Sequence, residues 1–309
     1  MPYWSSLENL PVKQASTNAD ARLADCRNQS ESCSCPHANL SGSVALITGG
    51  NASIGLETTR GLLNSGAQCI IACRSTEKAE QAVTELKKDS PAVSFVLLDL
   101  SDLNTLQKAV SDLSKVLTGG QQINILVENA GVLGGNGEKS AQGYELAFAT
   151  NVLGHFALRR MLLREGLLAE NARVVVVTGD IYFTASPPEC THDYSGESIQ
   201  TYKRSCLGRL WIAAELQRRM PLLHVVSVHP GVFFSNLFGP QGNPSSHQMD
   251  QAMGAQTSLF AATQPVEKGI YLHNTQGLML LHEDDPAMDR HKAHALWDQC
   301  ETLAAKFVP

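Results

Sequence analysis

A glycine-bearing turn is the part of the sequence best suited to chemistry, because its backbone can approach a charged ligand closely. The apolar run at 44–47 predicts a buried strand, and the residues Thr-Gly-Gly-Asn at 48–51 predict a turn after it. Helical character follows in the segment LETTRGLLNSG. A strand, a turn and a helix in this order direct free backbone N–H groups at a phosphate. We therefore expect a dinucleotide as the ligand of this turn.

The glycine spacing of the turn leaves an alternative open. The full dinucleotide fingerprint spaces three glycines as G-x-G-x-x-G. Here Ser53 stands between Gly49 and Gly55, where the middle glycine of a T-G-x-x-x-G-I-G pattern belongs. A tight turn between a strand and a helix, without any ligand, would have the same pattern. Residues farther along the chain decide between the two interpretations.

The residues after the second predicted strand bear on which dinucleotide is bound. In a dinucleotide fold an acidic residue here bonds the 2′-hydroxyl of the adenine ribose and repels a 2′-phosphate. Cys73 stands at that position and Arg74 follows it. Because a guanidinium group suits phosphate, the pair favours NADP(H) over NAD(H). A solvated loop cation is the alternative interpretation of Arg74.

Alternating strands and helices position these residues. Apolar runs predict strands at 44–47, 67–72, 93–98, 123–127, 174–177 and 224–228. Helices are predicted after the first turn and at 76–88, 103–117, 144–168, 200–219, 265–274 and 287–306. Continuous apolar strands that alternate with helices indicate a parallel sheet buried on both faces. The predicted fold class is α/β, with a single doubly wound (Rossmann) sheet and helices on both faces.

Composition and charge exclude several classes of function. The formal net charge of −6 argues against a nucleic-acid partner, because phosphate neutralisation needs clustered Lys and Arg. No apolar stretch approaches the roughly 20 residues that span a bilayer. The first residues lack the basic and apolar regions of a signal peptide. We therefore expect a cytoplasmic protein that acts on a small molecule.

The first 40 residues are polar and rich in Ser, Asn and Cys, which predicts a flexible extension ahead of a domain at 41–309. Cys26, Cys33 and Cys35 lie in this extension, close to His37. Thiolate and imidazole suit zinc, but the spacing C-x₆-C-x-C-x-H matches no closed zinc motif. We predict no metal site and an unstructured segment with reactive thiols. Metal or redox sensing by these cysteines is the alternative.

Further motifs follow the first turn in a recognisable order. They are Asn129-Ala130-Gly131, Asn151 within TNVLGHF, Tyr202 within TYKRSC, and Pro230-Gly231 within SVHPGVFFSNL. Together with the glycine turn, this series resembles the short-chain dehydrogenase/reductase family. It is most similar to the branch that contains retinol dehydrogenases and the WW-domain oxidoreductase. The resemblance extends over about residues 40–309.

The resemblance implies an NADP(H) site and a carbonyl–alcohol interconversion. The implied cofactor-binding residues are Gly49, Asn51, Ile54 and Gly55 in the first turn, Arg74 at the 2′-phosphate, Asp99 and Asn129 near adenine and ribose, and Val232 and Ser235 near the nicotinamide amide. The implied catalytic residues are Tyr202, which exchanges a proton with the substrate oxygen, and Asn151, which keeps a relay water in place.

The resemblance also implies where a homodimer would form. Dimers of the family use the two long helices around Asn151 and Tyr202. The alternative is that these helices present solvated faces. The residues that suggest it are Arg159, Arg160, Arg204 and Arg209.

The family's catalytic lysine, four residues after the tyrosine, is replaced here by Cys206. A neutral thiol supplies no positive field to lower the tyrosine pKa, which is near ~10 in the absence of perturbation. Lys203 follows Tyr202 directly and therefore points about 100° away on a helix. We do not expect Lys203 to replace the lysine.

The family's catalytic serine is also missing, because Gly179 falls on its position. Thr178 comes one residue earlier, so we expect it to face the other side of the strand. Removal of one oriented donor at a reacting oxygen typically costs about 10²–10³ in rate. A local bulge that rescues Thr178, or a side chain such as Asp180 or Tyr182 that reaches inward, remains open as a substitute.

The sequence therefore predicts an NADP(H)-dependent oxidoreductase that interconverts a carbonyl and an alcohol on a small or lipophilic substrate. Attenuated activity is expected from Gly179 and Cys206. The alternative is a non-catalytic NADP(H)-binding regulator or scaffold whose active site has decayed.

Overall fold

The computed structural model describes residues 12–18, 35–231 and 250–308. The described strands form one nine-stranded sheet in the order β1-β9-β8-β7-β6-β5-β2-β3-β4. Neighbouring strands are parallel except β8 and β9. The strands are β1 (Lys13–Gln14), β2 (Val44–Thr48), β3 (Gln68–Cys73), β4 (Val93–Leu97), β5 (Ile123–Glu128), β6 (Leu168–Val177), β7 (His224–His229), β8 (Tyr271–His273) and β9 (Gly277–Leu280).

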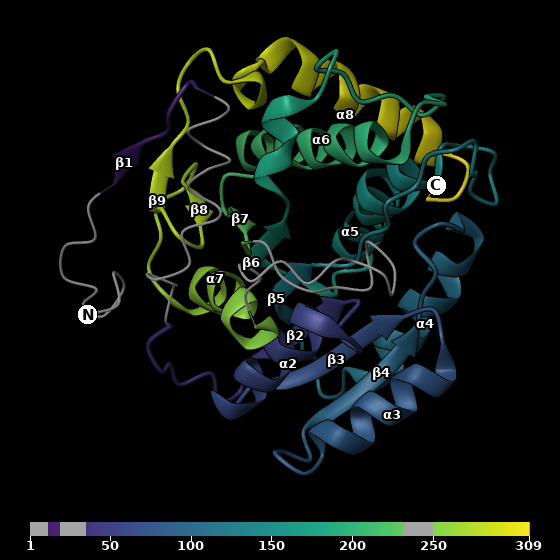
Figure 1. Ribbon diagram of the computed structural model, residues 1–309. Coiled ribbons are helices and arrows are strands. Elements are labelled where there is room, and N and C mark those ends of the chain that lie inside the picture. The colour runs from purple at the N-terminus through teal and green to yellow at the C-terminus, as the bar shows by residue number, and fades with distance from the viewer. Residues whose placement is uncertain (1–11, 19–34, 232–249, 309) are drawn as a thin grey trace.

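Helices cover both faces of the sheet (Figure 1). One face carries α4 (Leu106–Val116), α5 (His155–Arg164), α6 (Ser198–Arg219) and α8 (Arg290–Ala304). The other face carries α2 (Ser53–Asn64), α3 (Thr76–Leu86) and α7 (Gln251–Thr263). Short helical turns are η2 (Leu103–Thr105), the π-helix η3 (Phe148–Gly154), η4 (Asp180–Thr184) and η6 (Pro286–Met288). The predicted doubly wound α/β fold is confirmed.

Strand β6 illustrates why the apolar runs form strands buried on both faces. Successive strand residues point to opposite faces of a sheet. Val174 and Val176 belong to the hydrophobic core on the α4–α5–α6 side. Val175 and Val177 belong to the core on the α2–α3–α7 side. A run of four valines therefore supplies both cores at once.

The strand order reverses at β2, which is the feature that creates a site. From β2 the chain continues outward through β3 and β4, and then returns to β5 on the other side of β2. Loops at the carboxyl ends of β2 and β5 consequently diverge, and the crevice between them is where ligands bind in such sheets. The glycine turn follows β2 and lies at this crevice.

Two of the predicted helices differ from the structure. The helix predicted at 265–274 is wrong, because this segment contains β8, and the helix of this region is α7 instead. Small residues let α7 pack closely on α2. A Cβ on Gly61 of α2 would lie 2.6 Å from the Leu259 side chain of α7, so the contact depends on the absence of a side chain at Gly61. A helix buried by close contact of small residues has little apolar periodicity to reveal it. The helix predicted at 144–168 begins as η3 and ends with α5, because β6 starts at Leu168.

Described parts of the first 40 residues contact the domain. Lys13 and Gln14 form β1 beside β9, and Ala15 is buried. The backbone N–H of Cys35 donates to Gln256 Oε1 at 2.8 Å. These described residues contact the domain, and the flexible extension expected for the first 40 residues stays a prediction. Cys26 and Cys33 lie outside the described residues, and the described ranges contain no group of His, Cys, Asp and Glu suited to a metal ion.

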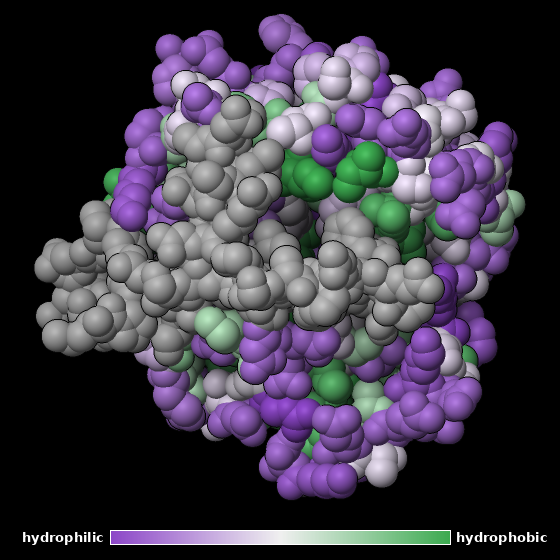
Figure 2. Space-filling model, viewed as in Figure 1, coloured by the Kyte–Doolittle hydropathy of each residue, from purple (hydrophilic) through white to green (hydrophobic). Residues whose placement is uncertain are grey.

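On the coloured part of the face in Figure 2, most side chains are hydrophilic and the hydrophobic ones lie in small groups. Among the described residues, the large hydrophobic side chains that are exposed are Val12, Leu97, Leu222, Leu280 and Met288. None of the helices in the described ranges is long and apolar enough to span a bilayer.

Candidate active site

One open cavity of about 1410 Å³ lies along the carboxyl ends of the central strands. Predicted site residues that line it are Gly49, Asn51, Ile54, Arg74, Asp99, Asn129, Asn151 and Tyr202. Gly55 lies directly behind the turn that forms one wall. Val232 and Ser235 lie outside the described residues. The structure thus brings together residues as distant in the sequence as Gly49 and Tyr202, and their roles stay predictions.

The glycine turn has a backbone that needs two left-handed residues. Gly49 has a φ of +66° and Ser53 a φ of +53°. Ser53, at the position of the missing glycine, thus adopts a conformation that is uncommon for a residue with a side chain. A Cβ on Gly55 would lie 2.3 Å from the Gly49 carbonyl oxygen, so only glycine fits there. The turn therefore keeps its shape with Ser53 in place of the middle glycine.

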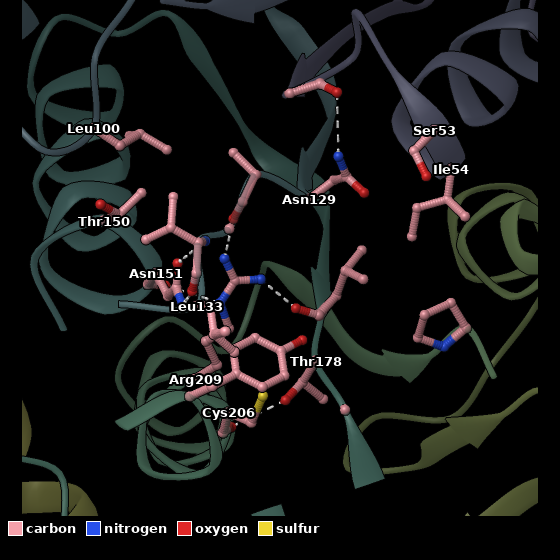
Figure 3. Close-up of a pocket in the computed structure, with 18 of the residues that line it drawn as sticks. Ser53, Ile54, Leu100, Asn129, Leu133, Thr150, Asn151, Thr178, Cys206 and Arg209 are labelled. Carbon is pink, nitrogen blue, oxygen red and sulfur yellow. Dashed lines mark hydrogen bonds between the residues drawn. The ribbon is translucent and has the colours of Figure 1, made fainter. Parts of the chain in front are cut away.

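The start of α2 is open to an anion. Ala52, which precedes the helix, makes no capping bond through its side chain, and the first turn contains no acidic residue. The Ser53 hydroxyl is buried without a hydrogen-bond partner among the described residues, and Ser53 lines the cavity next to Ile54 (Figure 3). A buried hydroxyl without a partner is costly and uncommon. This hydroxyl and the helix N-terminus therefore fit a pyrophosphate group.

Hydrogen bonds tie the turn to the loop after β5. The Thr48 hydroxyl accepts from the backbone N–H groups of Asn129 at 2.9 Å and Ala130 at 3.0 Å. The Asn129 side chain donates to the carbonyl oxygen of Thr48 at 3.0 Å. These bonds fix the two diverging loops on either side of the crevice. Asn129 acts here as a structural link as well as a cavity-lining residue.

The end of the cavity beyond β3 carries two cations. Arg74 and Lys78 are both exposed and both line the cavity, together with Ser75. Ser75 begins α3 by accepting from the backbone N–H of Lys78 at 3.3 Å. Lys78 was missed by the sequence reasoning, although its place in the first turn of the helix after Arg74 was a usable signal. Asp99 lies nearby and accepts from the hydroxyl of Ser101 at 2.6 Å.

The opposite end of the cavity contains Tyr202 and the two altered positions. A Cβ on Gly179 would lie 3.8 Å from the Tyr202 hydroxyl and 3.6 Å from the Cys206 sulfur. A side chain at 179 would therefore face Tyr202. Thr178 also lines the cavity, contrary to the expectation that it faces away. Its hydroxyl, however, donates to the carbonyl oxygen of Cys206 at 3.0 Å, so its proton is already used.

Asn151 is held entirely by protein groups. Its side-chain amide donates to the Val132 carbonyl and to the Ser205 hydroxyl, each at 2.9 Å, and its Oδ1 accepts from the Val132 N–H at 2.8 Å. Its main-chain carbonyl accepts from Arg209 Nε at 2.9 Å. Asn151 therefore orders the loop after β5 against α6. Its role in holding a relay water stays a prediction.

Three of the arginines that suggested solvated faces are buried in the described chain. Arg159 forms a buried ion pair with Glu128. Arg204 lies over the Tyr194 ring at 3.7 Å. Arg209 extends from α6 into the wall of the cavity (Figure 3). The sequence reasoning missed Arg209, because its partners come from distant strands and only its spacing from Tyr202 was visible.

Burial sets the protonation states around Tyr202. Burial raises the pKa of Tyr202 well above its usual value of 10.0, and the nearby Cys206 adds to this effect. Burial also raises the pKa of the Cys206 thiol, which shares a hydrogen bond with Tyr202. His155 is buried beside Arg209, and burial lowers its pKa well below 6.5. At neutral pH the tyrosine and the cysteine therefore keep their protons and His155 is uncharged.

Comparisons with known proteins agree with this geometry. Residues 43–194 match the family model described as short chain dehydrogenase. Retinol dehydrogenase 14 of Homo sapiens is 31% identical over 300 residues, which cover 85% of this chain and 87% of that protein. The WW domain-containing oxidoreductase of Drosophila melanogaster is 30% identical over 338 aligned positions, which cover 96% of this chain and 80% of that protein. A solved structure of an uncharacterized protein from Mycobacterium Paratuberculosis has a TM-score of 0.69 and 27% identity, over 88% of this chain and 97% of that chain.

Proposed function

Because this chain belongs to the short-chain dehydrogenase/reductase family, we propose that it is an NADP(H)-dependent oxidoreductase that interconverts a carbonyl and an alcohol. The observation that carries the proposal is the continuity of the cavity. A single open space runs from Arg74 and Lys78, past Ser53, to Tyr202. A continuous space with these lining residues supports the binding of an extended dinucleotide whose reacting end lies beside a proton donor.

The chain's own groups suit the separate parts of such a cofactor. Arg74 and Lys78 would hold the 2′-phosphate, since two cations that form no ion pair among the described residues favour a phosphate over a hydroxyl. The Ser53 hydroxyl and the N-terminus of α2 would hold the pyrophosphate. When bound, NADP(H) supplies or accepts the hydride.

Tyr202 would exchange the proton that balances the hydride. In reduction the Tyr202 hydroxyl donates its proton to the substrate oxygen as the carbonyl becomes an alcohol. In oxidation the phenolate takes that proton back. Gly179 offers no second donor to the oxygen, and Cys206 offers no charge, so we expect slow turnover.

The substrate is proposed to be lipophilic. Apolar residues near Tyr202 line the cavity, namely Val132, Leu133, Ile181 and Ile199. Several relatives are named retinol dehydrogenases, which makes retinol and retinal the first substrates to try. A cytoplasmic location and a homodimer through α5 and α6 remain predictions from the sequence.

Single-turnover oxidation of NADPH tests the proposal. Enzyme in excess is mixed with NADPH and a panel of retinal, aliphatic aldehydes, ketones and quinones, and Tyr202→Phe is the matched control. We expect turnover in the wild type that the Phe variant loses while it still binds NADPH. Binding of NADPH without turnover of any substrate would favour the second candidate, a non-catalytic NADP(H)-binding protein, which Gly179 and Cys206 support. Failure to bind NADPH would refute both.

A further inference from the structure

Helix α6 places an arginine on the same face as Tyr202. Arg209 follows Tyr202 by seven residues and Cys206 by three. Seven residues are almost two helical turns, so these side chains lie along one stripe of the helix. All three line the cavity. The chain therefore carries a permanent cation one turn beyond the position where its relatives' catalytic lysine would lie.

The guanidinium of Arg209 is held by four main-chain carbonyls. Its Nε donates to Asn151 at 2.9 Å, and Nη1 donates to Glu128 at 3.2 Å and to Val177. Its Nη2 donates to Ala130. These carbonyls belong to η3, to the ends of β5 and β6, and to the loop after β5, and Figure 3 shows the guanidinium among them. A group held at several points from different elements has little freedom to move.

The charge of Arg209 has no carboxylate partner in the described part of the chain. Its hydrogen bonds go to neutral groups, and the nearby Glu128 side chain forms its ion pair with Arg159. Burial lowers the pKa of Arg209, but a guanidinium keeps its proton in proteins. A buried charge that is not neutralised acts strongly on groups nearby, since the effective dielectric constant is low.

Other ionisable groups face the same space and must be weighed. They are Cys206 and Lys203 on α6, Glu128 on β5, His155 on α5, Asp180 on η4 and His229 on β7. Burial keeps the Cys206 thiol and His155 uncharged at neutral pH. Among the cations, Lys203 is the competitor of Arg209, because it also lines the cavity.

We propose that Arg209 is a positioning residue that supplies the fixed positive charge missing at Cys206, and that this charge stabilises the phenolate left on Tyr202 when its proton moves to the substrate oxygen. The inference rests on the proposed function, in which Tyr202 exchanges that proton. Arg209 would thus provide, from a different position, the positive charge that the family's catalytic lysine provides at the position of Cys206. The bonding part, a direct contact with the cofactor, is not assigned to Arg209, because its N–H groups are directed at four carbonyls and at His155 Nδ1.

The test is a titration of Tyr202 that needs neither substrate nor cofactor. The full chain is made with a fluorinated tyrosine, whose phenol is more acidic than that of tyrosine, and ionisation is followed by ¹⁹F NMR. Tyr202→Phe identifies the signal. The variants are Arg209→Gln, which removes the charge, and Arg209→Lys, which keeps it. Lys203→Gln removes the competing cation, and Arg204→Gln removes a buried arginine of α6 that stacks on Tyr194 instead.

We expect Arg209→Gln to raise the midpoint of Tyr202 by about one pH unit or more, a tenfold change in the ionisation constant. Arg209→Lys should stay within about half a unit of the wild type, and so should Lys203→Gln and Arg204→Gln. An unchanged midpoint in Arg209→Gln, or an equal shift in Lys203→Gln, would overturn the proposal. If Arg209→Gln does not fold, Arg209→Lys decides, because a rise of one unit despite the retained charge would also overturn it.

The result is independent of whether a substrate is found. A wild type that turns over nothing contradicts the proposed function, while the titration still reports whether Arg209 controls Tyr202. Conversely, turnover by the wild type with an unshifted midpoint in Arg209→Gln leaves the proposed function intact and removes Arg209 from it. In an active enzyme, single-turnover alcohol oxidation should slow about tenfold in Arg209→Gln at a pH below the midpoint, with NADP⁺ affinity unchanged.

Discussion

Gly179→Ser should restore the missing hydrogen-bond donor beside Tyr202. The backbone of Gly179 has φ −137° and ψ 138°, which any residue adopts without strain. The nearest atoms to a new Cβ are the Cys206 sulfur and Ile181 Cγ2, each at 3.6 Å, and the Tyr202 hydroxyl follows at 3.8 Å. Both distances are ordinary van der Waals contacts, so a serine fits without moving its neighbours. Its hydroxyl would then lie on the side of the cavity where the substrate oxygen meets Tyr202.

The expected gain is a factor of about 10²–10³ in the rate of hydride transfer, which is the usual value of one oriented donor at a reacting oxygen. Single-turnover oxidation of NADPH measures this rate directly, since product release does not enter it. The affinity for NADPH should not change, because Gly179 lies at the far end of the cavity from Arg74. Replacement of glycine at an unstrained position should also add about 0.4–1 kcal/mol to the free energy of unfolding.

Gly179→Ala is the matched control, because it adds the same Cβ without the hydroxyl. We expect the alanine variant to share the gain in stability and to show no gain in rate. Equal rates for the serine and alanine variants, both folded and both able to bind NADPH, would refute the assignment of position 179 to the reacting oxygen. The cavity would then no longer bring a carbonyl to Tyr202.

Three further predictions follow from the same geometry. Cys206→Lys puts a cation one helical turn from Tyr202 and should lower the pKa of Tyr202. The rising limb of the pH profile for alcohol oxidation should therefore move about one unit toward lower pH. An unchanged profile in a folded variant that binds NADP⁺ would contradict this. Arg74→Gln combined with Lys78→Gln should weaken NADPH about tenfold or more in a fluorescence titration and leave NADH almost unaffected, whereas equal losses would argue against a 2′-phosphate site. Gly55→Ala places a methyl group 2.3 Å from a carbonyl oxygen and should cost about 1–3 kcal/mol of unfolding free energy by denaturant titration, and wild-type stability would show that the turn can shift.

The sheet and the glycine turn were predictable because their signals are local. The four valines at the end of β6 indicate a strand buried on both faces without any knowledge of what covers it. The turn after β2 is indicated by Gly49, whose φ of +66° suits glycine, and by Gly55, where a Cβ would lie 2.3 Å from the Gly49 carbonyl oxygen. By contrast, α7 was missed because its burial depends on close contact with α2, which no local pattern reveals.

The role of Arg209 was not predictable for a different reason. A charged residue on a long helix most often faces solvent, and the sequence offers no sign of the four carbonyls that surround this one. Those carbonyls lie on η3, β5, β6 and the loop after β5, so they meet only when the sheet is assembled. The Ser53 hydroxyl, which lacks a partner within the described ranges, was unpredictable for the same reason, because its burial is set by the fold around the turn. Lys78 was predictable in principle from its place in the first turn of the helix that follows Arg74.

The protonation states give the proposed reaction a preferred direction at neutral pH. Burial holds the pKa of Tyr202 well above 10.0, so its hydroxyl carries the proton that carbonyl reduction requires. Reduction should therefore keep its rate as the pH rises through neutrality. Alcohol oxidation needs the phenolate, which is the minor form, and its rate should rise about tenfold per pH unit below that pKa. Because the pKa of Tyr202 is higher in the folded than in the unfolded protein, the free energy of unfolding should fall as the pH rises above the pKa of Tyr202 in the unfolded chain. With no lysine at 206, the proposed field of Arg209 opposes the effect of burial on the Tyr202 pKa, but that pKa stays raised. The site therefore remains better suited to give a proton to a carbonyl than to take one from an alcohol.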